Sequence, residues 1–546
     1  MMIHTNLRPE LAQHLAQRFQ AFADGFRHNL AILGPPGSGK TFQLQQVALR
    51  HPQRLLTIYC PLYQESCRSF LQRLLYAILQ AGLPAGRMQA GLPAAARAGE
   101  RTDQQFQPPL DQLLQRAEAA LPKTVAAIRL SEGVLARRQY GEAFTRALDA
   151  IPVLVQEREQ PCALMLDEFL YLEDLGLGQA FHELGKRVMT WPSVLFVLSS
   201  SSTYRARVIL RERLQLLFGQ FELLALSGLD QGTAGAWVQQ ELRGIRRAKH
   251  VSPFLLHWIG HYPWYLTVIL RRMKELATLG NSPELTEGLF LQTVWDVLGR
   301  AEGPLHQWCA SRMTSLSHGR AGARALETLL HIAEGARTAT ELGRRIGRGG
   351  LTDALQLLVS RDLAERSGMC WKVTDPILRC WLSTILLAQR SDAPPGGEEV
   401  RQRFDRHLRQ LWSGWMHAHE LTLPEQVVSL FGKFCDDTIA LDLKTGRLPR
   451  FETIRTAQPE LAGADAYVVA DGEGKRWCAA VRDQALGESD IAHFDAFCRT
   501  QAPRPTRKVL ITRGRLDQNA RLLAKTSNMW VWEVAELNTL LELYGP

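Results

Sequence analysis

The sequence lacks long hydrophobic runs: its 546 residues contain no stretch of about eighteen or more apolar residues. The N-terminal residues MMIHTNLRPELAQHL also lack the apolar centre of a signal peptide. Both absences predict a protein that neither spans a membrane nor is exported. The nine cysteines are scattered, and no two of them have the CxxC spacing. Reduced, mostly buried thiols and a cytoplasmic location are therefore expected.

Strong charge of one sign is also lacking. Lys and Arg number 64 against 55 Asp and Glu, which gives a formal net charge of +9. This excess permits a polyanionic partner such as nucleic acid but does not require one. Hydrophobic residues make up 46% and charged residues 22%, the composition of a globular protein, which excludes a disordered or fibrous chain. At roughly 150 residues per domain, three or four domains are expected.

Short apolar runs alternate with helical patterns in the first half of the sequence. We expect strands at 29–33, 55–59, 162–166 and 194–198, and helices at 8–22, 42–49 and 69–79. Strands that alternate with helices indicate right-handed βαβ units and a parallel sheet, so the predicted fold class is α/β. The segment from about 82 to 110 is rich in Gly, Ala and Pro without a sustained apolar period, which predicts a loop or insertion.

The first predicted strand leads into a turn with the pattern GxxxxGK[ST], and a predicted helix follows. Glycines let backbone N–H groups turn inward around phosphate oxygens, and the start of the helix adds its dipole. Lys40 is expected to contact the β and γ phosphates, and Thr41 to offer its hydroxyl to Mg²⁺. The pattern predicts an ATP site formed by Gly34, Pro35, Pro36, Gly37, Ser38, Gly39, Lys40 and Thr41.

The strand at 162–166 is followed by an acidic pair, Asp167 and Glu168. The carboxyl ends of parallel strands meet at one edge of a sheet, so we expect Asp167 to hold Mg²⁺ through water. Glu168 is expected to orient and deprotonate the attacking water, which points to hydrolysis. The alternative is an acidic pair that caps the following helix. Of the four serines after the next strand, Ser200 is predicted to touch the γ phosphate, although a solvent-exposed turn explains them almost as well.

The second half of the sequence suggests further domains. Helical periodicity continues from 229 to about 318, and three short amphipathic helices and two β-like pieces then follow in the order of a winged helix. Residues 388–400 are rich in Pro and Gly and are typical of a linker. The predicted domains are a phosphate-loop core (1–228), a helical lid (229–320), a winged helix (321–390) and a C-terminal domain (401–546).

Four further segments occur in the order expected for one family: DEFLYL (167–172), LFGQFELLALSGL (217–229), GHYPWYL (260–266) and TDPILRCWL (374–382). Together they resemble the archaeal-type ATPases of the STAND branch of AAA+ proteins. The resemblance covers roughly residues 29–382. It implies a nucleotide-binding α/β core, a helical lid, a winged helix and often a nuclease-like tail. It also implies that Pro263, together with Gly260, belongs to a lid element that couples bound nucleotide to domain position.

One departure from the family concerns residues Gly219 and Gln220. Members commonly carry Gly-Arg there, and a related position in AAA+ rings supplies an arginine to a neighbouring active site. Such an arginine is worth about 10³- to 10⁵-fold in turnover, so its absence implies slow hydrolysis, as in a switch rather than a motor. Four nearby arginines are alternatives for the role, or simply form a solvated helix face: Arg205, Arg207, Arg211 and Arg213.

Three arginines, Arg344, Arg345 and Arg348, precede the third helix of the predicted winged helix. In one interpretation they contact phosphates and position that helix in the major groove of DNA. In the other, the winged helix packs on the ATPase core in an autoinhibited state. Basic residues alone predict only a salt-dependent contact without sequence preference, so both interpretations stay open.

The tail resembles the nuclease-like domain that often ends these ATPases, whose chemistry needs an Asp and a Glu to hold metal and a Lys nearby. By this resemblance Asp465 is retained, but Ala480 and Arg482 stand at the Glu-x-Lys positions, and Cys435 replaces a helix glutamate. Ala480 offers no ligand oxygen to a metal. The resemblance therefore implies an inactive nuclease fold that can still bind DNA or a protein.

The leading prediction is a Mg²⁺-dependent ATPase whose nucleotide state moves the lid and winged helix, and thereby assembles or remodels a nucleic-acid-associated complex. The alternative is a regulatory scaffold that binds ATP, barely hydrolyses it, and recruits a partner protein through the C-terminal domain without contacting DNA. An active nuclease that depends on Asp465 is a third hypothesis. A protein partner and self-association are compatible with all three.

Overall fold

The computed structural model describes residues 7–50, 54–83, 109–212, 221–246, 248–280, 284–314, 316, 319–390, 397–441, 444–459 and 464–544. The chain divides into two compact units. Unit 1 consists of Met1–Arg243, Ile259–Leu270 and Ser360–Asp362, and unit 2 of Gly244–Trp258, Arg271–Val359 and Leu363–Pro546. Unit 1 includes short segments of the predicted lid and winged helix, so the two units do not coincide with the four predicted domains. The four-domain division remains a prediction.

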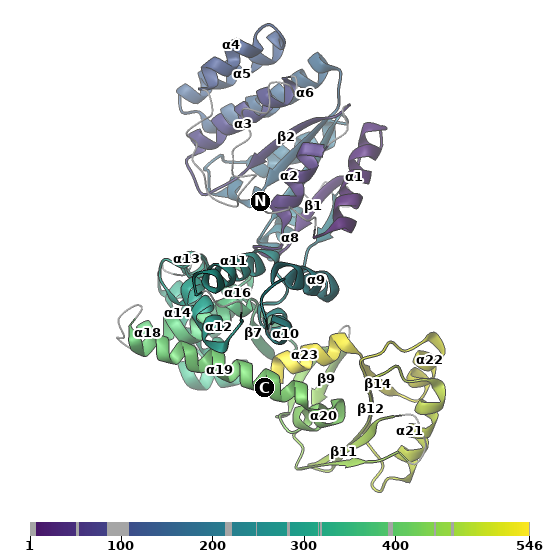
Figure 1. Ribbon diagram of the computed structural model, residues 1–546. Coiled ribbons are helices and arrows are strands. Elements are labelled where there is room, and N and C mark those ends of the chain that lie inside the picture. The colour runs from purple at the N-terminus through teal and green to yellow at the C-terminus, as the bar shows by residue number, and fades with distance from the viewer. Residues whose placement is uncertain are drawn as a thin grey trace. The chain divides into compact units, whose positions relative to one another are not determined.

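Unit 1 is built around a five-stranded parallel sheet in the order β2-β3-β4-β1-β5 (Figure 1). The strands are β1 (Asn29–Leu33), β2 (Leu56–Pro61), β3 (Cys162–Asp167), β4 (Val194–Ser200) and β5 (Phe221–Ala225). The first four are the strands predicted from apolar runs, and the α/β fold class is confirmed. β5 was not predicted as a strand. Its residues are only partly buried, so it lacks the continuous apolar run of the others.

Helices cover both faces of this sheet, as a parallel sheet requires. On one face α1 (Pro9–Ala23) and α2 (Lys40–Arg50) pack a core that includes Phe19 and Leu44. On the other face a larger core includes Phe70 and Phe144, and five helices contribute to it together with α8 (Thr203–Glu212). The five are α3 (Cys67–Gly82), α4 (Leu110–Ala117), α5 (Pro122–Ala136), α6 (Tyr140–Arg158) and α7 (Ala180–Thr190). Alternate residues of each strand feed the two cores, because successive strand side chains point to opposite faces.

Two helices of unit 1 follow the strands β4 and β5 along the chain. These are α8 (Thr203–Glu212), directly after β4, and α9 (Gln231–Glu241), which is capped by the Asp230 side chain. α11 (Pro263–Leu279) also begins in unit 1, in the segment 259–270. The structure thus brings the sequence GHYPWYL into the same compact unit as the phosphate loop.

Unit 2 opens with a helical region, as the periodicity of 229–318 predicts. It contains most of α10 (Ala248–Ile259), then α12 (Glu287–Val294), a π-helical turn at Trp295–Gly299, and α13 (Pro304–Thr314). Phe254 of α10 stacks with Trp258 and meets Phe290 of α12 edge-on. Trp412 and Trp415 of α19 (Glu398–Glu420) join the same aromatic cluster, so α19 is packed against this helical region.

Three helices and a hairpin follow in the order predicted. They are α14 (Gly319–Ala333), α15 (Ala339–Ile346), α16 (Leu351–Ser360), β6 (Ala364–Ser367) and β7 (Cys370–Val373). The short helices α17 (Pro376–Trp381) and α18 (Leu387–Arg390) flank a π-helical turn at Leu382–Leu386 and come before α19. Further helices therefore follow the β6–β7 hairpin directly along the chain.

The C-terminal region forms a mixed sheet in the order β10-β11-β12-β13-β14, antiparallel from β10 to β12 and parallel from β12 to β14. Its strands are β10 (Thr453–Ala457), β11 (Ala466–Gly472), β12 (Lys475–Arg482), β13 (Arg507–Thr512) and β14 (Met529–Trp532). α21 (Glu488–Thr500) and α22 (Gln518–Thr526) cover one face. α20 (Leu423–Phe431), α23 (Val534–Tyr544) and the hairpin of β8 (Asp437–Leu441) and β9 (Lys444–Leu448) contribute to the core on the other.

The tip of the β6–β7 hairpin is docked on β8 within unit 2. The Met369 backbone N–H donates to the Thr438 carbonyl at 2.7 Å, and buried Cys370 joins the aromatic core of the C-terminal region. Gly368 has φ +64°, and a Cβ there would lie 2.4 Å from the Thr438 carbonyl oxygen. Nearby, the Arg337 guanidinium lies over the Tyr544 ring at 4.9 Å. The hairpin tip is thus an intramolecular contact.

Several sequence predictions fall on residues outside the described set. These are most of the insertion near 82–110, and residues Arg213, Gly219 and Gln220. All nine cysteines are described and free, and eight of them are buried while Cys435 is exposed. Within the described ranges, no helix has both the length and the apolar character needed to cross a membrane.

Candidate active site

The phosphate loop joins the end of β1 to the start of α2. Gly37 and Gly39 adopt φ +77° and +97°, the left-handed region that a residue with a side chain rarely adopts. Left-handed residues in such a turn bend the backbone so that its N–H groups converge on one point. α2 begins at Lys40, so the N–H groups of its first turn have no partner inside the helix and face the same place. The loop is therefore shaped to receive an anion.

Two close approaches fix this loop in place. A Cβ at Gly34 would lie 2.4 Å from the Leu226 carbonyl oxygen, and a Cβ at Gly37 would lie 2.9 Å from Cβ of Trp264. The Trp264 N–H also donates to the Gly37 carbonyl at 3.3 Å. Glycine at 34 thus serves close packing against the segment after β5. Glycine at 37 lets the start of α11 contact the loop.

Lys40 lies inside the site, with only 4% of its surface exposed. Its ammonium donates to the Gly34 carbonyl at 2.7 Å, the Pro35 carbonyl at 3.1 Å and the Ser201 hydroxyl at 2.9 Å. Burial lowers the pKa of Lys40, and the carboxylate of Glu168, 3.9 Å away, opposes that shift. Lys40 is thus a desolvated cation held at the mouth of the loop by neutral oxygens that a phosphate can replace.

Asp167, at the end of β3, is almost fully buried. Its Oδ1 accepts a hydrogen bond from the Ser199 hydroxyl, and its Oδ2 accepts one from the Tyr59 hydroxyl at 3.0 Å. Burial raises the pKa of Tyr59, and the neighbouring Asp167 raises it further, so this phenol stays protonated and remains a donor. Both oxygens of Asp167 are thereby oriented by neutral donors.

Glu168 follows in the left-handed conformation, with φ 57° and ψ 46°. Its carboxylate accepts hydrogen bonds from the Ser201 N–H at 2.8 Å and from the Ser201 hydroxyl. Burial raises the pKa of Glu168, whereas Lys40 and the bonds from Ser201 oppose the rise. Glu168 is the N-cap residue of a short 3₁₀ helix at Phe169–Glu173, but its side chain makes no capping bond there. The helix-capping alternative therefore does not describe its contacts.

The structure brings Ser201, rather than Ser200, to the charged groups. The Ser200 hydroxyl bonds to Ser202, accepting from its N–H at 3.1 Å, as expected of a serine-rich turn. Ser201 bridges Lys40 and Glu168 through one hydroxyl. That Ser200 touches the γ phosphate stays a prediction, and four consecutive serines gave no signal that Ser201 is the one whose hydroxyl lies between Lys40 and Glu168.

The other predicted residues are arranged as follows. The Thr41 side chain is exposed in the first turn of α2. The Ser38 hydroxyl is buried and has no hydrogen-bond partner among the described residues. Pro263 begins α11, after Gly260 and His261 with φ 71° and 61°, and so sets the direction in which Trp264 meets the loop.

Sequence reasoning missed several residues that shape the site. Tyr59, Ser199, Ser201 and Trp264 were not singled out, since aromatic and serine residues carry no spacing signal of their own. Arg8 was missed too: it lies between the Ser38 carbonyl, 3.2 Å from its Nε, and the Ser227 carbonyl. Its guanidinium ties the N-terminal segment to the phosphate loop.

These residues fit a triphosphate with magnesium. The loop supplies converging N–H groups, a desolvated ammonium and an orphaned buried hydroxyl at Ser38, all of which are donors suited to phosphate oxygens. Asp167 and the exposed Thr41 hydroxyl supply the oxygen ligands that Mg²⁺ prefers. The donor set thus matches the ligand that the motif predicts.

The C-terminal region contains the residues that the resemblance places at the positions of a nuclease site: Asp465, Ala480, Arg482 and Cys435. Asp465 accepts a hydrogen bond from the Asp483 N–H at 2.7 Å, and Arg482 forms an ion pair with buried Asp490 at 2.5 Å. Ala480 is buried in the sheet, and Cys435 is exposed. In the part of the chain that the structure describes, no three His, Cys, Asp or Glu side chains are grouped so as to hold a metal ion.

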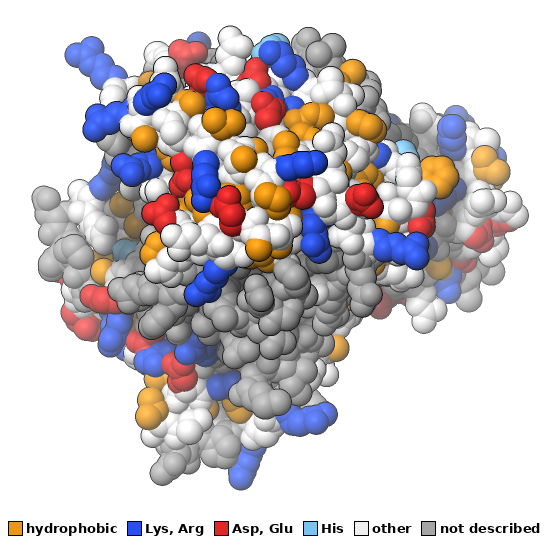
Figure 2. Space-filling model, turned by 90° about the horizontal axis from the view of Figure 1, so that it is seen from above, with side chains coloured by type: hydrophobic (Ala, Val, Ile, Leu, Met, Phe, Trp, Pro, Cys, Tyr) orange, Lys and Arg blue, Asp and Glu red, His pale blue; other side chains and the backbone are white. Residues whose placement is uncertain are grey.

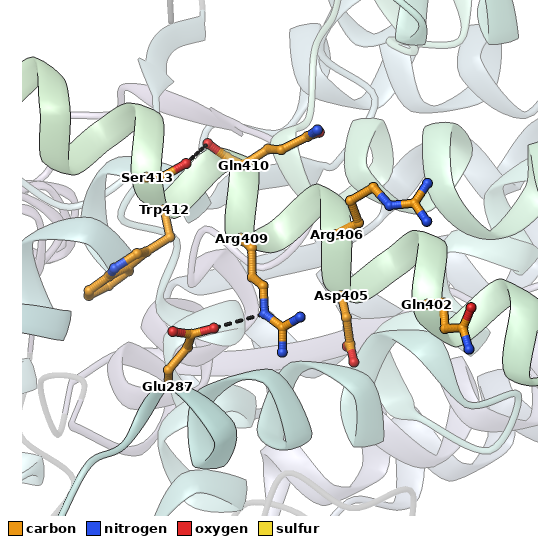
Figure 3. Close-up of a pocket in the computed structure, with 8 residues that line it drawn as sticks. All are labelled: Glu287, Gln402, Asp405, Arg406, Arg409, Gln410, Trp412 and Ser413. Carbon is orange, nitrogen blue, oxygen red and sulfur yellow. Dashed lines mark hydrogen bonds and ion pairs between the residues drawn. The ribbon is translucent and has the colours of Figure 1, made fainter.

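A cavity of about 510 Å³ lies along α19 in unit 2 (Figure 3). Glu287, the first residue of α12, faces Arg409 there, with 2.8 Å between Oε1 and Nε. The remaining lining residues all belong to α19: Gln402, Asp405, Arg406, Gln410, Trp412 and Ser413. Charges of both signs line the cavity and no residue of the phosphate loop takes part, so it is separate from the predicted ATP site.

No family model matches the sequence, and no curated protein matches it either. Among solved structures, the chain is similar to a Walker-type ATPase of Pyrococcus abyssi, with a TM-score of 0.45 and 12% identity over 69% of this chain and 95% of that one. The ORC2 protein of Aeropyrum pernix gives a TM-score of 0.42 and 17% identity, over 71% and 96% of the two chains. RuvB of Thermotoga maritima, a Holliday junction branch migration motor, gives 0.32 and 12%, over 71% and 95%. The α/β fold with a phosphate loop at the end of β1 follows from this chain's own strand order and loop geometry.

Proposed function

We propose that this protein is a Mg²⁺-dependent ATPase whose nucleotide state controls the assembly or remodelling of a nucleic-acid-associated complex. The observation that carries the proposal is the convergence of three charged side chains at one edge of the sheet. Lys40 and Glu168 lie 3.9 Å apart and share Ser201, and Asp167 directly precedes Glu168 at the end of β3. Lys40 and Asp167 are buried and Glu168 is partly buried, so these charges lose hydration, and such clusters of desolvated charged groups occur preferentially at functional sites.

Binding begins at the phosphate loop. The N–H groups around Gly37 and Gly39, and the first turn of α2, receive phosphate oxygens, and the Ser38 hydroxyl gains the partner that it lacks. The Lys40 ammonium exchanges its bonds to the Gly34 and Pro35 carbonyls for the β and γ phosphates. The desolvation that lowers the pKa of Lys40 makes its attraction for phosphate stronger than in water.

Asp167 and Thr41 are the residues that would hold Mg²⁺. When bound, Mg²⁺ neutralises charge on the phosphates as it develops during phosphoryl transfer. Glu168 acts as the base that orients the attacking water and accepts its proton at a carboxylate oxygen. Its raised pKa makes it a stronger base than an exposed glutamate.

Slow turnover is part of the proposal. Each carboxylate oxygen of Glu168 accepts one hydrogen bond from Ser201, which orients the carboxylate and leaves a second lone-pair site on each oxygen for water. Slow turnover is therefore assigned to the lack of the arginine that the resemblance expects at position 220, where this chain has Gln220. Of the arginines near the site, Arg205 is paired with Glu173, while Arg207 and Arg211 belong to the same helix. The lack of an arginine at position 220 suits a nucleotide switch whose turnover a partner or nucleic acid raises.

A route from nucleotide to the rest of the chain begins at Trp264. Its side chain and N–H both contact Gly37, so a phosphate that reshapes the loop changes a contact at the start of α11. Pro263 fixes the first turn of that helix. This contact gives the GHYPWYL segment its proposed role as the element that reports nucleotide state.

Nucleic acid is proposed to bind through the region α14–α16. Arg344, Arg345 and Arg348 are exposed there, at the end of α15 and before α16. On the face of the molecule that Figure 2 shows, the visible Lys and Arg side chains are interspersed with Asp and Glu and do not gather into one patch. Since the β6–β7 tip is docked on β8, contact with phosphates is assigned to the helices and these arginines rather than to the hairpin tip.

The ATPase proposal is tested by two substitutions. Lys40→Ala should abolish ATP binding in calorimetry, whereas Glu168→Gln should keep ATP binding and lower turnover about 10²- to 10⁴-fold. Lys123→Ala, at an exposed lysine of the same unit, is the matched control and should leave both unchanged. Equal turnover in the wild type and the Glu168→Gln variant would remove Glu168 from its role.

A second candidate function is a regulatory scaffold that recruits a protein through the C-terminal domain. The docked β6–β7 tip and the Arg482–Asp490 pair favour it, because they occupy the groups that a wing or a nuclease would use. A gel-shift with salt titration separates the two: binding that weakens steeply with salt supports nucleic-acid binding, and its absence at every salt concentration supports the scaffold. Plasmid cleavage that disappears in Asp465→Ala would instead support a nuclease.

A further inference from the structure

We propose that Tyr59 is a positioning residue that holds Asp167 in the orientation needed to bind magnesium. The inference rests on the proposed ATPase function and adds a residue to it that no motif contains. Asp167 has two carboxylate oxygens, and each one receives a hydroxyl donor: Tyr59 on Oδ2 and Ser199 on Oδ1. Each oxygen of the Asp167 carboxylate is therefore held by one hydrogen-bond donor.

The register of the sheet places these donors. β2 and β4 flank β3, and Pro61 of β2 pairs with Asp167 of β3. Tyr59 lies two residues before Pro61 and so projects to the same face of the sheet as Asp167. Its hydroxyl reaches Oδ2 at 3.0 Å. Ser199 approaches Oδ1 from β4, on the opposite side.

Tyr59 also connects Asp167 to the phosphate loop's helix. The Gln45 side chain of α2 interacts with Tyr59 and opposes the rise of its pKa. Thr41, the other proposed magnesium ligand, lies one turn earlier on α2. Tyr59 thus contacts Asp167 of β3 and interacts with α2, the two elements that would supply the oxygen ligands.

The two hydrogen bonds from Tyr59 and Ser199 leave the Asp167 carboxylate able to bind metal. Each carboxylate oxygen has a second lone-pair site that the single donor does not occupy. What the donors prevent is rotation of the carboxylate about χ2, which is otherwise a broad and soft torsion. Donors of this kind, behind a metal ligand, are typically worth about 10- to 100-fold in metal affinity.

The test uses Tyr59→Phe, which removes the hydroxyl and keeps the ring. With the full-length protein and a non-hydrolysable ATP analogue, Mn²⁺ affinity is measured by electron paramagnetic resonance. We expect the variant to bind Mn²⁺ about 10-fold more weakly. Binding of the analogue in EDTA should change less than about twofold, since the loop and Lys40 supply that affinity. Tyr204→Phe is the matched control, because Tyr204 belongs to the same unit and is 46% exposed, and it should behave like the wild type.

An unchanged Mn²⁺ affinity in a folded Tyr59→Phe protein would overturn the inference. If that variant does not fold, Ser199→Ala removes the donor on the other oxygen and should weaken Mn²⁺ binding by a similar factor. Failure of the ATPase proposal is distinguishable, because then the wild type itself would bind no analogue. A structural role alone would lower thermal stability without changing the Mn²⁺ affinity of the folded protein.

Discussion

Replacing Gly34 by alanine is a sharp test of the loop's geometry. The added Cβ would lie 2.4 Å from the carbonyl oxygen of Leu226 and 2.9 Å from its Cβ. Neither atom is the movable end of a long side chain, so the segment after β5 must shift. That shift strains the hydrogen bond from the Leu226 N–H to the Leu33 carbonyl, which is 2.7 Å long.

The expected cost follows from these contacts. Forced packing of one extra methyl group costs about 1 to 3 kcal/mol. A weakened backbone hydrogen bond adds about 1 kcal/mol, so the free energy of unfolding should fall by about 2 to 4 kcal/mol. Because the Gly34 carbonyl also accepts from Lys40 at 2.7 Å, ATP binding should weaken as well.

The matched control is Gly133→Ala. Gly133 lies in α5 of the same unit, and a Cβ there meets nothing within 4 Å. That variant should be about 0.5 to 1 kcal/mol more stable, since alanine favours helix over glycine. Urea denaturation gives the free energies, and hydrogen exchange of peptides from β1 and β5 locates the change. A Gly34→Ala protein as stable as the wild type, with β5 protected equally, would refute the reasoning.

Four further predictions follow from the structure. Ser201→Ala should lower steady-state ATP turnover about 10-fold or more, because its hydroxyl touches both charged groups, whereas Ser200→Ala should change little. Turnover should fall as pH decreases through the pKa of Glu168, which burial raises, because a protonated base cannot accept a proton; a pH–rate profile without this acid limb would contradict it. Because of the same shift, the folded protein binds the Glu168 proton more tightly than the unfolded chain does. The stability that protonated Glu168 contributes should therefore decrease as pH rises from 4.5 towards the raised pKa of Glu168. Gly368→Ala should free the β6–β7 tip for limited proteolysis, while Gly349→Ala, where a Cβ meets open space, should not.

The sequence predicts the parts of the fold that depend on continuous burial. β1, β3 and β4 are buried along their whole length and consist mainly of apolar residues, and β2 is buried at alternate positions, so short apolar runs reveal all four. β5 is half exposed at the edge of the sheet, and its pattern does not differ from that of a loop. The strand order is also hidden, because β4 separates β1 from β3 through contacts between distant residues.

The candidate site was predictable where chemistry requires a fixed spacing. Glycines, Lys40 and Thr41 follow one another in the loop because backbone geometry dictates it, and Asp167 and Glu168 stand at a strand end. Tyr59, Ser201 and Trp264 reach the site from separate elements. Their roles depend on strand register and helix direction, which a linear pattern does not contain.

Unit 1 is discontinuous along the chain, and this affects how its proposed activity can be studied. A fragment that ends at Arg243 keeps the whole sheet but loses the segments 259–270 and 360–362. Gly37 would then lose the N–H of Trp264, and the first turn of α8 would lose the Asp362 carboxylate, which accepts from the Ser202 hydroxyl at 2.8 Å and the Tyr204 N–H at 3.1 Å. Binding or kinetic constants from such a fragment would therefore describe a candidate site missing two of its supports, and residues far downstream in the sequence belong to the same compact unit as the phosphate loop.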